Sequence, residues 1–163
     1  MSRAPRRRNP QAPEARLALE LSYAARRPWV PRRADFARWA AAALPRSSAP
    51  VDLSIRVVGT AASRRLNLRF RGKPRPTNVL SFAGAGRTPD GRRHLGELLI
   101  CAPLVAREAR AARRPAPAHW AHLTVHGVLH LRGFDHERDR DAREMIAMEV
   151  QILDRLGFSD PYR

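Results

Sequence analysis

The sequence contains a single cysteine, so a covalent scaffold cannot support its fold. Cys101 is the only cysteine in 163 residues, and no intramolecular disulfide can form. Because it ends the apolar run Leu98-Leu99-Ile100, we expect a small buried residue in a reducing compartment, without a disulfide partner. With 44% hydrophobic residues, the chain has the length and composition of one globular domain that is stabilised by its core.

Long apolar runs are also missing. No run of about 18 apolar residues could cross a bilayer, and the first residues, MSRAPRRRNPQAPEAR, lack the apolar segment of a secretory signal. We therefore expect a cytoplasmic protein with no membrane partner. Residues 1–15 are rich in proline and arginine, which predicts a basic disordered tail before a single domain over residues 16–163.

Lysine and acidic residues are scarce. Lys73 is the only lysine among 31 basic residues, and 15 acidic residues leave a net charge of +16. Such a charge attracts polyanions, above all nucleic acid. Arginine and alanine are frequent along the whole chain, however, so a biased base composition of the source genome explains the charge equally well. The decision between the two rests on the motifs.

The hydrophobic pattern predicts an α+β fold with α/β-type layers. Strands are expected where residues alternate or form short apolar runs, and helices where alanine-rich or amphipathic segments lie between proline and glycine stops. The expected strands cover residues 17–23, 51–58, 78–82 and 94–101, and the expected helices cover 32–44, 60–70, 103–114, 117–131 and 139–156. Since only helices follow Pro103, we predict a small four-stranded mixed sheet packed with about five helices.

Half of the histidines fall in one short motif near the C-terminal part of the chain. Three of the six lie in HGVLHLRGFDH, residues 126–136. His126 and His130 share one helix face, and Gly133 is expected to end that helix in a left-handed conformation that brings His136 back toward the same ion. Three histidines that leave one position open are typical of catalytic zinc, whereas structural zinc has four ligands rich in cysteine. The motif predicts one Zn²⁺ per chain.

The same histidine spacing occurs in zinc proteases, which are the main alternative. Their glutamate beside the first histidine is the general base, and here that position is Gly127. The three metal-binding histidines are therefore present without the glutamate that acts as the base in proteases. This favours metal-assisted hydrolysis of something other than a peptide, or a base from elsewhere in the chain.

Three further residues are candidates for contacts behind the metal ligands. Glu149 falls within the expected buried stripe of the last helix, which is formed by Ala142, Met145, Ile146, Ile152, Leu153 and Leu156. A buried carboxylate needs a partner, either a ligand imidazole or an arginine. Asp135 is either an acid or base beside the ion or a turn residue, and His122, one turn before His126, is interpreted as a support for the ligands or a packing residue.

A family resemblance is carried by three stretches: HWAHLTVHGVLHLRGFDHERDRDAREMIAMEVQILDRLGFSDPY, NLRFRGKPRPTNVLSF and LGELLIC. From about residue 50 onward, the chain resembles the YbeY family of metal-dependent single-strand endoribonucleases. The resemblance implies that residues 16–163 form a catalytic metallohydrolase domain with His126, His130 and His136 as zinc ligands. It implies action in ribosomal RNA maturation, including 3′-end processing of the small-subunit RNA, and in ribosome quality control.

The resemblance also assigns residues outside the histidine motif. Arg71 corresponds to the basic residue that the family needs for activity, and Thr77 and Asn78 match a signature with a structural or cleft-lining role. Glu97 stands where the family generally has aspartate. An arginine fork can hold a phosphate bidentately, and the nearby RNA-binding candidates, interpreted otherwise as a solvated basic loop, are Arg69, Lys73 and Arg75.

Three classes of function follow from these observations. A zinc-dependent endoribonuclease would have single-stranded RNA, ribosomal RNA and the small ribosomal subunit as partners. The alternatives are a zinc metalloprotease-like hydrolase and a non-catalytic RNA- or ribosome-binding protein. The first two need the histidine site, and the third needs only the positive charge.

Overall fold

A four-stranded mixed sheet forms the centre of the computed structural model, which describes residues 16–135 and 137–163. The predicted tail, residues 1–15, and the predicted ligand His136 lie outside the described residues. The elements follow the order β1 (Leu17–Tyr23), α1 (Arg33–Ala42), β2 (Val51–Val58), α2 (Thr60–Arg71), β3 (Val79–Ala83), β4 (Arg93–Cys101), α3 (Ala102–Ala111), α4 (Ala116–Leu131) and α5 (Asp139–Arg155). The predicted fold class and the predicted elements are confirmed.

The strands lie in the order β1-β2-β4-β3. β1, β2 and β4 are parallel, and β3 pairs antiparallel with β4, with Val79 opposite Ile100. Each parallel neighbour is reached through a helical crossover, as parallel strands require. β3 is consequently an edge strand, and it lies beside the helix that carries the histidines.

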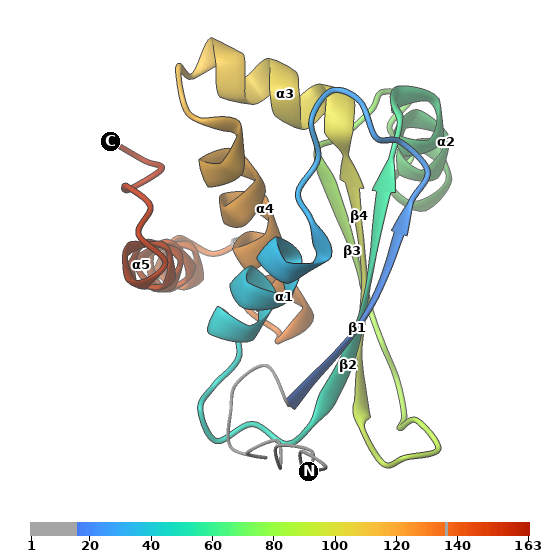
Figure 1. Cartoon of the computed structure of the whole chain (residues 1–163), viewed down its shortest axis with the longest axis vertical. Coiled ribbons are helices and arrows are strands. Elements are labelled where there is room, and N and C mark those ends of the chain that lie inside the picture. Colours follow the sequence, from blue (N-terminus) through green and yellow to red (C-terminus); the bar gives the residue numbers. More distant parts are fainter. Residues whose placement is uncertain (1–15, 136) are drawn as a thin grey trace, which may run out of the picture.

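Helices cover both faces of the sheet (Figure 1). Alternate side chains of β4 pack into the helical layers on the two faces of the sheet, because successive residues of a strand point to opposite faces. Leu98 and Ile100 belong to the main core, which includes residues of α1, α4 and α5, whereas Leu99 and Cys101 pack with Leu66 of α2. The histidine helix and α2 therefore lie on opposite faces of the sheet.

Three aromatic rings fix α1 against α4. Phe36 contacts the rings of Trp39 and Trp120 edge-on, with ring centroids 5.9 and 5.7 Å apart. All three side chains are buried, and such edge-to-face pairs add to the energy of burial. α5 packs in turn on α4, so the helix that carries the histidines is held between the sheet and α5 (Figure 1).

Two details differ from the sequence-based prediction. The helix expected over residues 103–114 ends at Ala111, because Arg113 takes a left-handed backbone conformation with a φ of 52° and reverses the chain before Pro115. Ile146, expected in the buried stripe of the last helix, is 39% exposed. Cys101 is buried, as predicted. Within the described residues no helix is long and apolar enough to cross a membrane.

Candidate metal centre

The helix α4 presents four histidines in a row. His119, His122, His126 and His130 recur at three- or four-residue spacing, which places them on one side of a helix. Neighbouring ring centroids lie 6.1, 6.2 and 4.5 Å apart along the row. Gly133 then ends the helix with a φ of 96°, and its N–H donates to the carbonyl of His130. The predicted left-handed turn after the histidine helix is confirmed.

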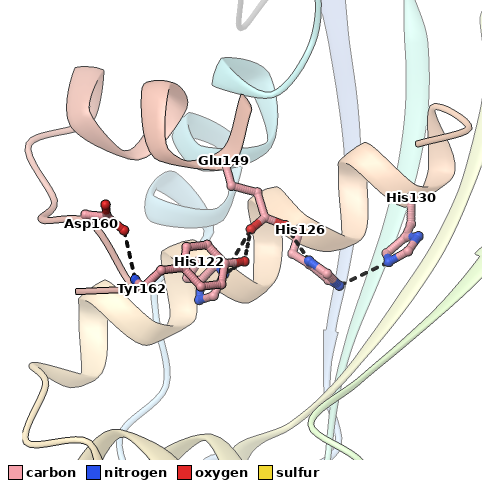
Figure 2. Close-up of polar contacts among 6 residues, drawn as sticks. All are labelled: His122, His126, His130, Glu149, Asp160 and Tyr162. Carbon is pink, nitrogen blue, oxygen red and sulfur yellow. Dashed lines mark hydrogen bonds and ion pairs between the residues drawn. The ribbon is translucent and has the colours of Figure 1, made fainter. Parts of the chain in front are cut away.

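His126 and His130 point their ring nitrogens at each other (Figure 2). Their Nε2 atoms are 3.1 Å apart, and the two rings are inclined at 79°. Two imidazoles that bind one zinc tetrahedrally at about 2.0–2.1 Å hold their nitrogens about 3.3 Å apart. The observed separation is close to that value, so the pair fits a shared divalent ion.

Glu149 of α5 supports His126 from behind. Its carboxylate is fully buried and accepts a hydrogen bond from Nδ1 of His126. His122 Nε2 lies 3.3 Å from the second carboxylate oxygen, which also accepts from the hydroxyl of Tyr162. Of the two partners that the sequence left open for Glu149, the structure contains the imidazole. A ligand histidine whose second nitrogen donates to a carboxylate is oriented by that contact.

The charge of Glu149 is set by these donors. Burial opposes ionisation, but the hydrogen bonds from His122, His126 and Tyr162 outweigh it, and the pKa of Glu149 is lowered to about 2. Because the carboxylate is ionised at neutral pH, Nδ1 of His126 carries the proton of their hydrogen bond. The Nε2 atom, which faces His130, then bears the lone pair that a metal needs.

A second ligand set is also possible. His122, His126 and Glu149 offer one ligand atom each within 4.8 Å of one another, a cluster that could hold a metal. It shares His126 with the predicted set of His126, His130 and His136. The described residues thus contain a His/His/Glu cluster and the facing His126–His130 pair on the same helix.

Gly127 is buried where α4 crosses β4. A Cβ atom added to it would lie 2.7 Å from Cδ2 of Leu98, closer than side-chain carbons approach. Leu98 is fully buried in the core and has little room to move. A glutamate at this position would point into the sheet, so the missing protease base follows from the close approach of helix and strand.

The basic residues that were predicted from the sequence lie at and after the end of α2. Arg71 is the last residue of this helix, and its side chain is exposed, as are those of Arg69, Lys73 and Arg75. The carboxylates of Glu97 and Asp90 pair with other arginines: Glu97 with Arg56 at 3.1 Å, and Asp90 with Arg92 at 3.1 Å.

The signature around Thr77 and Asn78 has structural contacts. The hydroxyl of Ser63 donates to the carbonyl of Thr77 at 2.8 Å and accepts from its N–H at 2.9 Å. The Asn78 amide donates to Glu108 at 3.1 Å. These bonds fasten the start of β3 to α2 and α3. Asp135, at the exposed turn after α4, accepts from the N–H of Glu137 at 3.2 Å.

Two polar contacts were missed at the sequence level. Tyr162 reaches Glu149 from the segment after α5, and His119 Nε2 lies 2.7 Å from Glu108, whose pKa is lowered because hydrogen bonds from His119 and Asn78 outweigh its burial. Neither Tyr162 nor Glu108 belongs to a motif with periodic spacing. Only the packing of α3 and α5 against α4 brings them to the histidine row.

Comparisons with known proteins point to one family. The model of the family described as endoribonuclease YbeY matches residues 32–157. The endoribonuclease YbeY of Laribacter hongkongensis (strain HLHK9) is 46% identical over 148 residues, which cover 90% of this chain and 89% of the relative. The solution structure of TM1509 from Thermotoga maritima has a similar fold, with a TM-score of 0.57 at 22% identity over 90% of this chain and 99% of that chain.

Proposed function

The chain belongs to the endoribonuclease YbeY family, and we propose that it cuts single-stranded RNA with the help of a zinc ion held by His126, His130 and His136. Its membership makes it a nuclease, a hydrolase of phosphodiester bonds. The substrate we propose is ribosomal RNA of the small subunit, at its 3′ end, with a further role in ribosome quality control. Residues 16–163 would act in the cytoplasm as a single catalytic domain.

One observation carries the choice of metal ligands. Nε2 of His126 faces Nε2 of His130 at 3.1 Å while Nδ1 of His126 is bound by the ionised Glu149. In the other set, Glu149 would have to be a ligand itself, although its two oxygens already accept from His122, His126 and Tyr162. A buried carboxylate with three donors is better suited to orient a ligand than to replace one.

The chain supplies the remaining chemistry with its own side chains. A zinc ion, when bound, polarises a phosphoryl oxygen and lowers the pKa of water to about 7. Glu149 fixes the ring of His126, and Tyr162 and His122 fix Glu149 (Figure 2). We assign to Arg71 the binding of the scissile phosphate by its planar fork of N–H donors.

Single-stranded RNA fits this arrangement better than a duplex. A flexible strand can bend its backbone toward a recessed ion, which a stiff duplex cannot easily do. The exposed Arg69, Lys73 and Arg75 beside Arg71 are proposed to contact the phosphates on either side of the cut. The net charge of +16 would attract the strand to the protein.

A cleavage assay tests the function. The protein, loaded with zinc, is incubated with single-stranded RNA, with duplex RNA and with an unfolded protein, each with and without a chelator. We expect cleavage of the single strand alone, abolished by the chelator. Binding of RNA without any cleavage would favour the non-catalytic RNA-binding alternative, and cleavage of the unfolded protein would favour the protease.

A pair of variants tests the ligand set. His130→Ala removes a ligand of the proposed set only, and His122→Ala removes one of the other set only. We expect His130→Ala to lose zinc affinity by more than the 10–100-fold typical of lost supporting contacts, and His122→Ala to lose less. If His122→Ala loses the metal and His130→Ala retains it, the ion is held by His122, His126 and Glu149.

A further inference from the structure

A cavity of about 450 Å³ lies away from the histidines, between the C-terminal ends of α1 and α4 and one side of α5. It is larger than the cavity of about 230 Å³ beside the metal centre, which is lined by His126, Glu149 and Tyr162. Four arginines line the larger cavity: Arg16, Arg46, Arg132 and Arg155. We call it the arginine cavity.

The helix α5 separates this cavity from the metal centre. Met145 and Glu149 of α5 line the small cavity at the histidines, whereas Met148, Gln151 and Arg155 line the arginine cavity. Residues three or four apart share a helix side, so the two sets form neighbouring stripes on the same helix. Because a helix with its side chains is about 10 Å wide, a single strand of RNA that crosses α5 could contact both the arginine cavity and the metal centre.

The arginines of the cavity have no acidic partner among the residues that line it. Nε of Arg16 is buried and makes no hydrogen bond within the described part of the chain. Arg132 donates to the backbone carbonyl of Ala43 at 2.7 Å, which fixes its guanidinium without neutralising it. Burial and, after it, the charge of Arg93, which lies outside the cavity lining, lower the pKa of Arg132. Arg16 and Arg132 are half-buried, whereas Arg46 and Arg155 are exposed at the rim of the cavity. A partly buried cation without a counter-charge is costly, and an anionic ligand would reduce that cost.

We propose that the arginine cavity binds a phosphate group of the RNA backbone, as an anchor separate from the metal centre. The planar guanidinium forks suit phosphate oxygens, and phosphate contacts position a nucleic acid without reading its sequence. This inference rests on the proposed function, because the phosphate is taken to belong to the same RNA that is cut. The anchor would hold long substrates and leave short ones unaffected.

Charge-matched variants test the anchor. The double variant Arg16→Gln/Arg155→Gln removes two charges from the cavity, and Arg46→Gln/Arg155→Gln removes two from its exposed rim in case Arg16 is needed for folding. The control, Arg38→Gln/Arg110→Gln, removes two exposed charges elsewhere. Arg132 stays unchanged because it bonds to Ala43. Melting curves confirm that each variant is folded.

RNA affinity is measured at several salt concentrations with a long single strand and with a short oligoribonucleotide that fills only the metal centre. We expect the cavity variants to bind the long strand about tenfold more weakly than the control variant, as for one lost charged hydrogen-bond pair. Their salt dependence should be shallower by about 0.7 for each lost phosphate contact. Cleavage of the short oligoribonucleotide should match the wild type.

Equal losses in cavity and control variants would overturn the anchor. Binding of inorganic phosphate to the cavity, with RNA affinity no weaker than in the control, would show that the cavity takes free phosphate and that the RNA assignment is wrong. If the wild type fails to cut the short oligoribonucleotide, the proposed function has failed. The anchor is judged only by the binding measurements, so the two failures are distinguishable.

Discussion

Replacing Gly127 with alanine tests whether the contact between α4 and β4 dictates a glycine. Gly127 lies between the two proposed ligands on α4 and is buried. At a solvent-exposed position in the middle of a helix, a change from glycine to alanine stabilises a protein by about 1 kcal/mol, because glycine loses more conformational entropy on folding. If Gly127 only stands where proteases have their glutamate base and no packing requires a glycine there, Gly127→Ala should show this gain.

The structure predicts the opposite sign. The added Cβ would lie 2.7, 3.0 and 3.4 Å from Cδ2, Cδ1 and Cγ of Leu98, whereas ordinary contacts are 3.4–4 Å. Leu98 has no exposed surface, so α4 must move away from the sheet or Leu98 must adopt a strained rotamer. Overpacking of this kind costs about 1–3 kcal/mol. With a typical cost of about 2 kcal/mol set against the helix gain, we expect a net loss of about 1 kcal/mol.

Urea unfolding measures this difference, and a double-mutant cycle assigns its cause. Leu98→Ala alone should destabilise the protein by about 2–5 kcal/mol through the cavity it leaves. In that background Gly127→Ala should become stabilising, because its methyl group enters the vacated space, with a coupling of at least about 1 kcal/mol. A gain of about 1 kcal/mol for Gly127→Ala in the wild-type background, with no coupling to Leu98, would refute the packing argument.

Three further predictions concern the metal centre and RNA. Arg71→Ala should slow cleavage of single-stranded RNA by roughly a hundredfold without changing zinc content or melting temperature. Arg71→Lys should restore activity only in part. Cleavage by Arg71→Ala at the wild-type rate would show that Arg71 does not bind the scissile phosphate. Glu149→Gln should weaken zinc binding by about 10–100-fold, as measured by competition with a chelating dye, whereas Glu144→Gln on the exposed side of α5 should have no effect. RNA affinity should fall steeply with salt, and a flat response would indicate that the positive charge reflects composition alone.

The regular elements could be read from the sequence because their signals are local. The alternation over residues 17–23 and 51–58 matches the observed burial of β1 and β2, since a strand that covers a core on one face must alternate. The end of α3 was misplaced, because the left-handed conformation of Arg113 has no glycine or asparagine to announce it. Ile146 is exposed although the sequence places it in the buried stripe of α5. Helical periodicity identifies the buried side of a helix, but it does not show how far the neighbouring elements cover that side.

The sequence by itself determined the spacing of the histidines, the glycine turn that ends their helix and the membership in the family. These features depend on residues that are close along the chain, where the geometry of a helix fixes their relative positions. Only the tertiary structure decided which imidazole nitrogen faces which partner, because Glu149 reaches His126 from a different helix and Tyr162 reaches Glu149 from the segment after that helix. It also decided that α2 and α4 lie on opposite faces of the sheet, and that four arginines from distant segments line one cavity. Such long-range contacts arise from the packing of whole elements, which no local pattern encodes.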